Sequence, residues 1–247
     1  NSLASVVITT LPALGSLALN GVAVTANQVV SAADIASGLL KFTPVANASA
    51  SPYASFTFQV RDNGGTSNSG VDTDASANTF TINVTAVNDA PTLVTPLVDQ
   101  SATEDVSFTY SVPVGAFADI DTTTLTYTAT LADGGTLPTW LSFDAIGRTF
   151  SGTPLDGDVG SIAVKVTASD GSLTVSDVFT ITVVSVNDAP SGADATRTIL
   201  EDGVYTFSAS DFGFSDVNDT PANSLASVVI TTLPALGSLA LNGVAVT

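Results

Sequence analysis

The stretch TFTINVTAVNDAP at residues 79–91 recurs as VFTITVVSVNDAP at residues 178–190, 99 residues later. Apolar and polar residues alternate through most of the first copy, and β-branched residues dominate the second, as in strands with a buried face. The shared ending VNDAP contains Asn, Asp and Pro, which are typical of turns. The two copies therefore predict two all-β modules that end in the same strand and the same turn.

A second repeat sets the organisation of the chain. Residues 1–25, NSLASVVITTLPALGSLALNGVAVT, return letter for letter at residues 223–247, 222 residues later. That period is too long for one turn of a solenoid and suits two domains. It comprises one module of 99 residues and one of 123. We thus assign residues 1–89 to the later part of a longer module whose opening part is absent, residues 90–188 to a complete shorter module, and residues 189–247 to the opening part of the next longer module.

These assignments leave two half-modules, for which two explanations remain open. The chain is a window on a much longer tandem protein, or the closing half of one molecule completes the opening half of another in a head-to-tail fibre. Strand-like runs occupy residues 5–10, 56–60, 79–85, 107–112, 125–130, 161–168 and 178–184. A single short helix is expected within residues 31–40, with Ser31 as N-cap. The predicted fold is a series of Greek-key β-sandwiches placed end to end.

Composition excludes several classes of function. The chain carries 23 acidic and five basic residues, a net charge of −18, which argues against binding nucleic acid or an anionic membrane. Cys, His and Met are absent, so there are no disulfides, no thiolate or imidazole ligands for zinc, and no Ser-His or Cys-His pair. Aromatic residues such as Trp140, Phe143 and Phe150 are expected in a core rather than on a ligand-binding face. We expect no enzymatic activity.

Several motifs resemble a known family. VNDAP, the Glu-Asp pairs at Glu104-Asp105 and Glu201-Asp202, and DIDTTTLTY at 119–127 resemble cadherin-like modules of large bacterial surface proteins. Residues 137–171 are similar to the dystroglycan-type cadherin subset. The longer module is similar to repeats of giant type I-secreted, RTX-type adhesins. The resemblance implies a cadherin/Ig-like sandwich, an extracellular location on or near a bacterial cell surface, and a role in adhesion or biofilm.

The resemblance also implies Ca²⁺ at the joints between modules, with one or two ions in each. Calcium prefers carboxylate and carbonyl oxygens, which this composition supplies. The first joint would use Asn88, Asp89, Asp119, Asp121 and Asp170. The second would use Glu104, Asn187, Asp188, Asp216, Asn218 and Asp219, and Asp156 and Asp158 stand where the family often places further acidic ligands. The alternative for VNDAP is a plain turn in which Asn and Asp side chains bond to the local backbone.

The sequence departs from the family at the first joint, because residues 42–60 of the longer module contain no acid. Three functions stay open at this point. The first is a calcium-rigidified spacer of a giant adhesin or surface fibre. The second is a filament subunit that assembles by complementation between half-modules or by lateral association. The third is a module that binds carbohydrate or protein. The expected partners are neighbouring copies of the same repeat, without nucleic acid and without membrane insertion in this segment.

Overall fold

The computed structural model describes residues 1–219 and 221–247. The chain divides into two compact units, Asn1–Asp89 and Ala90–Thr247, which are described here one at a time. Both are built mainly of antiparallel strands, as predicted for an all-β protein. In the described part of the chain, no helix has the length and apolar character needed to cross a bilayer.

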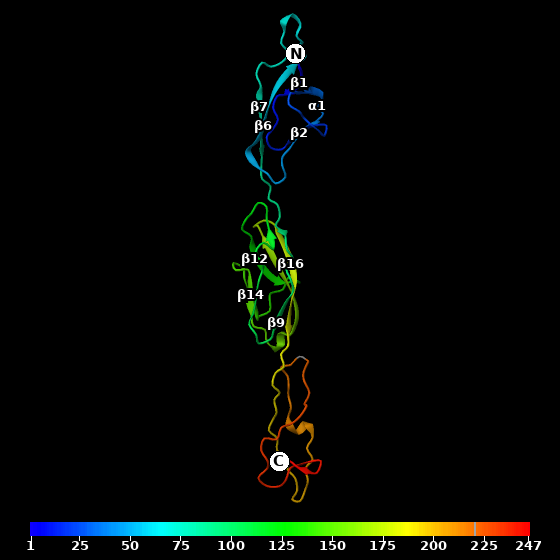
Figure 1. The fold of residues 1–247 in the computed structure, drawn as a ribbon, viewed down its shortest axis with the longest axis vertical. Helices are drawn as coiled ribbons and strands as arrows, with labels where there is room; N and C mark the ends of the chain where they lie inside the picture. Colours follow the sequence, from blue (N-terminus) through cyan, green and yellow to red (C-terminus); the bar gives the residue numbers. More distant parts are fainter. Residues whose placement is uncertain (220) are drawn as a thin grey trace. The chain divides into compact units, whose positions relative to one another are not determined.

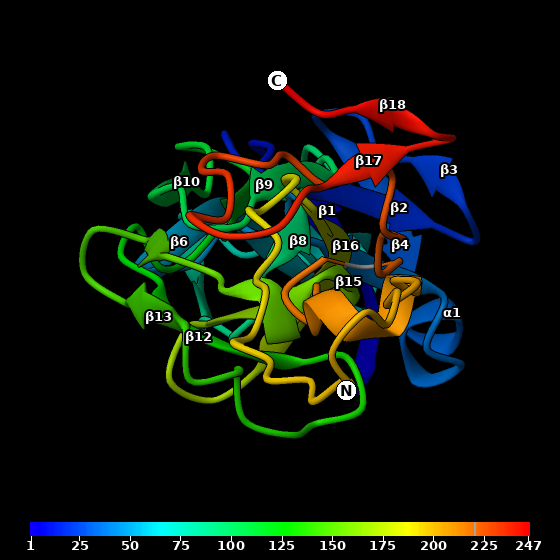
Figure 2. The same cartoon turned by 90° about the horizontal axis from the view of Figure 1, so that it is seen from below.

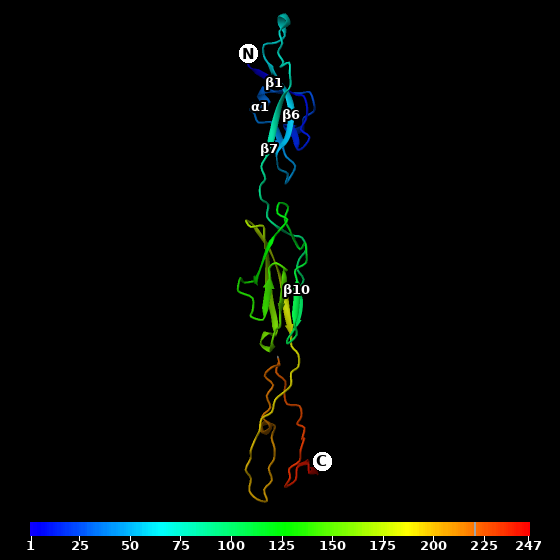
Figure 3. The same ribbon diagram turned by 90° about the vertical axis from the view of Figure 1, so that its left-hand side faces the viewer.

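Unit 1 contains two sheets that enclose a small core (Figure 1, blue to cyan). The larger sheet has the strand order β4-β1-β6-β7 and the smaller one β3-β2-β5. The strands are β1 (Leu3–Ile8), β2 (Ser16–Leu19), β3 (Val22–Ala23), β4 (Gln28–Ser31), β5 (Leu40–Thr43), β6 (Ala50–Asp62) and β7 (Asn78–Val84). Strands β6 and β7 pair antiparallel and run side by side in Figure 3.

The core of unit 1 consists of Ile8, Leu17, Val24, Val30 and Phe56, contributed by both sheets and the segment after β3. A one-turn helix, α1 (Ala32–Ala36), follows β4. The Ser31 hydroxyl accepts the backbone N–H of Asp34 at 3.0 Å, which confirms the predicted N-cap. A 3-10 turn, η1 (Ser67–Ser69), lies between β6 and β7.

The first part of unit 2 is a two-sheet sandwich (Figure 1, green to yellow). One sheet has the order β12-β15-β16-β9 and the other β10-β14-β13, with a small pair β11-β8 beside them. The strands are β8 (Thr92–Leu93), β9 (Gln100–Thr103), β10 (Phe108–Ser111), β11 (Phe117–Ala118), β12 (Thr126–Leu131), β13 (Leu141–Asp144), β14 (Thr149–Gly152), β15 (Gly160–Ser169) and β16 (Thr174–Val184). Strand β9 pairs in parallel with the end of β16. A strand from the start of the module therefore covers the edge of its last strand.

The sandwich core is larger than the core of unit 1 and contains residues from both sheets. Phe150 lies 5.6 Å from Phe179, ring centre to ring centre, and both are almost fully buried. Trp140 and Phe143 pack against this cluster, which confirms their predicted place in the core. Every second residue of β16 near its end, Phe179, Ile181 and Val183, points into the core, as the strand period requires.

Residues 189–247 of unit 2 contain little regular structure. Their elements are a 3-10 turn, η3 (Ala209–Phe212), and a hairpin of β17 (Ala240–Leu241) and β18 (Val244–Ala245), which Figure 2 shows in red. In the preceding sandwich, a further 3-10 turn, η2 (Asp156–Asp158), lies before β15. Each of the seven strand runs expected from the sequence overlaps an observed strand, and the largest difference is at β6, which begins at Ala50 where the expected run begins at residue 56.

Candidate functional site

Glu104 is the most buried acidic residue of the chain's described part, with 1% of its surface exposed. It follows β9, and its backbone N–H donates to the carbonyl of Val184 at 3.1 Å, which extends the parallel pairing by one bond. Its Oε1 atom accepts the Ser185 hydroxyl at 3.1 Å and also the backbone N–H of Val186. The buried carboxylate therefore fixes the chain at the point where the last strand of the module becomes the VNDAP turn.

The two VNDAP turns have the same local hydrogen bond. The side-chain amide of Asn88 donates to the carbonyl of Asp89 at 3.1 Å, and that of Asn187 donates to the carbonyl of Asp188 at 3.0 Å. This is the local bonding expected of Asx residues in turns. The VNDAP sequence thus forms a turn through its own local hydrogen bonds and needs no ligand to do so.

Beyond the second turn, Asp188 is tied to residues 30 and more positions later. The backbone N–H of Asp188 donates to Oδ1 of Asp219 at 3.0 Å. The side-chain amide of Asn223 donates both to Oδ2 of Asp219 at 2.9 Å and to Oδ1 of Asn187 at 2.8 Å. Asp219 is 7% exposed. These bonds make a polar joint between the end of the complete module and the start of the next.

Negative charge accumulates at this joint. Partial burial, followed by repulsion from Asp156 and Asp219, raises the pKa of Asp188 above its ordinary value of 3.8. Loss of solvent and the adjacent Asp219 carboxylate also raise the pKa of Asp216. Asp105 and Glu104 add smaller repulsion to Asp188. Loss of solvent and, to a smaller extent, mutual repulsion therefore disfavour the ionised forms of Asp188 and Asp216 in this arrangement.

The other predicted ligands of the second joint have different surroundings. The Asp158 carboxylate accepts the backbone N–H of Leu155 at 2.9 Å and so stabilises the turn η2. Asn218 is exposed. The structure therefore gathers Glu104, Asp156, Asp188, Asp216 and Asp219 at or near one joint, while Asp158 serves its own turn.

The residues predicted for the first joint divide between the two units, and each half is described by itself. Asn88 and Asp89 end unit 1. In unit 2, Oδ1 of Asp119 accepts the backbone N–H groups of Asp121 at 2.8 Å and Thr122 at 2.7 Å. Oδ1 of Asp170 accepts those of Ser172 at 2.6 Å and Leu173 at 2.7 Å. Each of these two carboxylates thus has one oxygen engaged in a local turn.

The fit of these residues to a cation is mixed. Three buried carboxylate oxygens, Glu104 Oε2, Asp119 Oδ2 and Asp216 Oδ1, have no hydrogen-bond partner within the described residues. Oxygen donors of this kind suit Ca²⁺. However, within residues 1–219 and 221–247 no three acidic side chains converge closely enough to hold a metal ion. The donors are chemically suitable, but their positions do not form a closed coordination shell.

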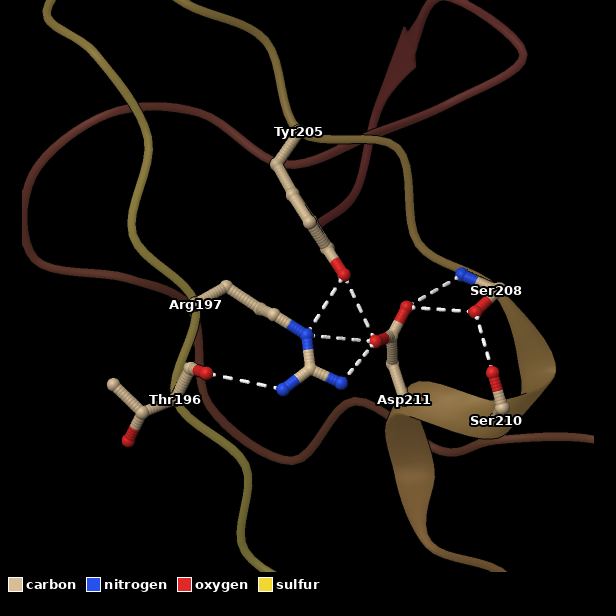
Figure 4. A network of polar contacts seen from close by, with 6 residues as sticks. All are labelled: Thr196, Arg197, Tyr205, Ser208, Ser210 and Asp211. Carbon is tan, nitrogen blue, oxygen red and sulfur yellow. Dashed lines mark hydrogen bonds and ion pairs between the residues drawn. The ribbon is translucent and has the colours of Figure 1, made fainter.

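A second polar network lies within residues 196–211 of unit 2 (Figure 4). Arg197 Nε donates to Oδ1 of Asp211 at 2.9 Å and contacts the Tyr205 hydroxyl at 3.0 Å, and that hydroxyl donates to Asp211 at 2.8 Å. The backbone N–H of Ser208 also donates to Asp211 at 2.8 Å. Hydrogen bonds from Ser208, then from Tyr205 and Arg197, hold the pKa of Asp211 well below its usual range. The network holds the segments around Arg197 and Tyr205 together.

Sequence reasoning missed two residues of the joint, Asp105 and Asn223, and the pair of Arg197 with Asp211. Asp105 was visible as the second member of the Glu-Asp pair, and Asn223 as the first residue of the 25-residue repeat. Neither had a signal that placed it at the joint, because both reach it through tertiary packing. The pairing of Arg197 with Asp211 likewise joins residues 14 positions apart in a segment without regular structure.

Comparison with known proteins gives a family match for part of the chain. Residues 90–184 match the family model described as "Putative Ig domain". No curated protein sequence matches the chain significantly. The matched residues contain the complete two-sheet sandwich of unit 2.

Solved structures similar to the chain include proteins of different kinds. The endo-fucoidan hydrolase MfFcnA4 from glycoside hydrolase family 107 is 22% identical over 72% of this chain and 23% of its own, with a TM-score of 0.34. Cadherin domains 1–4 of protocadherin gamma B7 are 20% identical over 60% of this chain and 37% of theirs, with a TM-score of 0.40. Titin domains z1z2, solved with telethonin, are 12% identical over 75% of this chain and all of theirs, with a TM-score of 0.35.

The chain spans about a quarter of the length of the fucoidan hydrolase that it resembles. Its own sheets and the match of residues 90–184 define the fold class. The protein is all-β and built of β-sandwich modules, and the module of residues 90–184 is Ig-like.

Proposed function

We propose that this chain is a structural repeat segment of an extracellular bacterial adhesin or surface fibre, in which acidic joints that bind Ca²⁺ fix one β-sandwich module against the next. The carrying observation is the joint between Asp188 and Asp219, where a hydrogen bond links the end of one module to the opening of another. The letter-for-letter repeat supports a spacer, because identical copies supply length and leave no copy with a unique site. No catalytic role is proposed.

At the second joint the proposed cation would be held by Glu104, Asp188, Asp216 and Asp219. When bound, Ca²⁺ supplies positive charge that neutralises neighbouring carboxylates. Two carboxylates about 4 Å apart repel by roughly 4 kcal/mol at an effective dielectric constant of about 20, so a cation between them is favourable. Binding would draw the acidic side chains closer than they lie now, and it would stiffen the joint by linking residues of both modules.

Calcium titration at fixed ionic strength tests the proposal. The melting temperature and the small-angle scattering profile of the full chain are followed from chelator to millimolar Ca²⁺, with Mg²⁺ in parallel. We expect Ca²⁺ to raise the melting temperature of unit 2. We also expect it to narrow the distribution of overall dimensions of the chain that the scattering profile reports. The double variant Asp188→Asn/Asp219→Asn should lose both effects. Asp144→Asn, which alters an exposed turn carboxylate bonded to Ile146 and Gly147, is the matched control.

An identical response of the wild type and the double variant would contradict a cation at this joint. If Ca²⁺ has no effect at any concentration, the VNDAP sequences are plain turns, held by the local hydrogen bonds of the Asn88 and Asn187 side chains, and they bind no cation. The spacer would then depend on packing and hydrogen bonds alone.

A further inference from the structure

The complete module of unit 2 has an open cleft of about 690 Å³. One side is formed by residues 114–127, which include the first residues of β12, and the other by the turn 145–148 between β13 and β14. Every residue that lines the cleft therefore belongs to the same sandwich. Its volume falls within the range of about 300–1,000 Å³ that is usual for sites that bind small molecules.

Arg148 lines the cleft from a strained backbone conformation. Its φ is 54°, in the left-handed region. Elsewhere in the described residues, the eight other non-glycine residues with positive φ are Asn, Asp or Ser, whose short polar side chains can bond to the local backbone. Arginine has no such compensation. Strained residues persist where the surrounding structure holds them, and they cluster at ligand sites, so the guanidinium is the first candidate for a ligand contact.

The Arg148 guanidinium is held in place but is not neutralised. Its Cζ atom lies over the Tyr127 ring, 5.7 Å from the ring centre, and Phe117 packs edge-on to the same ring at 6.0 Å. Arg61 and Arg197 each pair with an aspartate, whereas Arg148 forms no ion pair with any described residue. A guanidinium that lies face-on to a ring still directs its N–H groups outward in its own plane. It can therefore bind a carboxylate at two points.

The rest of the lining suits a ligand that carries hydroxyl groups on a partly apolar body. Four threonines within residues 122–126 line the cleft. Oδ2 of Asp119, which also lines it, is buried and has no hydrogen-bond partner among the described residues, so it can accept a bond from a ligand hydroxyl. Val114 and Ile146 add apolar side chains that are 84% and 95% exposed. This combination of apolar contact and a few polar groups is typical of ligand sites.

An added peptide strand fits the cleft less well than a sugar does. Within the described residues, β12 and β13 are open edges of their sheets. However, β13 contributes no residue to the lining, and β12 contributes only Thr126 and Tyr127. Strand addition needs a row of backbone groups along an edge, which the cleft does not offer. The net charge of −18 also repels a ligand with many negative charges.

We propose that this cleft binds a sugar that carries one carboxylate, as a uronic acid flanked by neutral sugars does. The Arg148 guanidinium binds the carboxylate, while the threonine hydroxyls and Oδ2 of Asp119 bond to sugar hydroxyls. Val114 and Ile146 contact the apolar face of the ring. The site goes beyond the proposed spacer, because it needs neither the acidic joint nor a cation. In a tandem array each copy of the module would present the same cleft, so weak single sites would gain avidity.

Titration of the full chain with two matched disaccharides tests the site. Glucuronosyl-glucose and the glucosyl-glucose of the same linkage differ only in the carboxylate, and chelator excludes calcium bridging. Amide NMR shifts of residues 122–127 and 145–148 should saturate with glucuronosyl-glucose, at an affinity more than about tenfold above that of the neutral disaccharide. Equal affinity for the two disaccharides would overturn the proposal, and so would the absence of saturable shifts in these residues.

Variants locate the contact. Arg148→Gln should weaken the binding of glucuronosyl-glucose by more than about tenfold. Lys165→Gln is the matched control, because it removes the same charge from β15, outside the lining, and should leave the affinity unchanged. Arg148→Gln also removes the contact with Tyr127, so Thr124→Val serves as a second variant at an exposed residue. It should weaken binding at an unchanged melting temperature. Wild-type affinity in both Arg148→Gln and Thr124→Val would refute the assignment.

A third probe separates a sugar site from a site for peptide ends. The acetylated dipeptide of alanine and valine carries a carboxylate and apolar side chains but no hydroxyl group. Binding of this dipeptide as tight as that of glucuronosyl-glucose would assign the cleft to peptide carboxyl ends and would overturn the sugar proposal. The residues proposed to hold Ca²⁺ at the second joint do not line the cleft, so failure here leaves the calcium titration to be judged by itself.

Discussion

The carboxylate of Glu104 and the backbone N–H of Val186 are hydrogen-bonded across 82 residues of sequence, in a place where Glu104 is 1% exposed. This contact connects the residue that follows β9, near the start of the complete module, to the residues that follow β16, its last strand. Because β9 pairs in parallel with β16, the bond also fixes how the ends of these two strands are aligned. The stability of the module and the path of the chain out of β16 therefore both depend on the Glu104 side chain.

Glu104→Ala should destabilise unit 2 by about 1–3 kcal/mol, because the Val186 N–H and the Ser185 hydroxyl lose their buried acceptor. Glu104→Gln retains a carbonyl acceptor and should lose less. Denaturant unfolding of the full chain measures both. Glu201→Ala changes the equivalent but exposed residue, and an equal loss there would contradict the role of burial.

The stability of unit 2 without calcium should rise as the pH falls from neutral towards the raised pKa values of Asp188 and Asp216. The pKa values of Asp188 and Asp216 are raised in the folded chain. A carboxyl whose folded pKa exceeds its unfolded value binds its proton more tightly when folded, so it favours folding below that raised pKa and loses this contribution as the pH rises through it. Melting curves in chelator at several pH values measure the trend.

Asp188→Asn/Asp216→Asn should flatten this pH dependence, because both variant side chains are neutral throughout. Asp133→Asn, which removes a carboxylate bonded to Gly135 in an exposed turn, is the control and should retain it. A steeper dependence in the double variant would show that other groups set the response.

Gly152→Ala should destabilise the sandwich strongly, by about 1–3 kcal/mol or more. A Cβ at this position of β14 would lie 1.7 Å from the backbone oxygen of Trp140, and backbone cannot move aside as a flexible side chain does. Gly157→Ala is the control, since a Cβ there meets nothing within 4 Å. Thermal melting followed by Trp140 fluorescence reads out the transition, and equal melting temperatures for the two variants would refute the clash.

Phe179→Ala should cost about 3–5 kcal/mol, because it removes a buried ring from the core of the sandwich. Phe80→Ala, at the same position of the repeated strand motif in unit 1, should cost clearly less because half of that ring is already exposed. Hydrogen exchange measured separately on peptides from each unit gives the two losses. Equal losses would mean that Phe80 is covered in solution to the same extent as Phe179.

The long strands and the core aromatic residues could be predicted from the sequence because their signals are local. Alternation of apolar residues marks β7, and an apolar run marks β16. The two-residue strands β8 and β11 carry too few residues for any period and exist only because they pair with each other. The acidic joint was predictable in composition, but Asp105 and Asn223 enter it through contacts that no local pattern records.

The 25-residue repeat separates what sequence determines from what tertiary structure decides. In both copies the Asn-Gly pair, Asn20-Gly21 and Asn242-Gly243, adopts positive φ and forms the same hairpin, since this turn depends only on its own backbone. Residues 3–8 form β1 between β4 and β6, whereas the identical residues 225–230 form no strand. Ile8 is fully buried and Ile230 is 43% exposed. A strand needs partners for its backbone and its apolar face, and those come only from elsewhere in the fold.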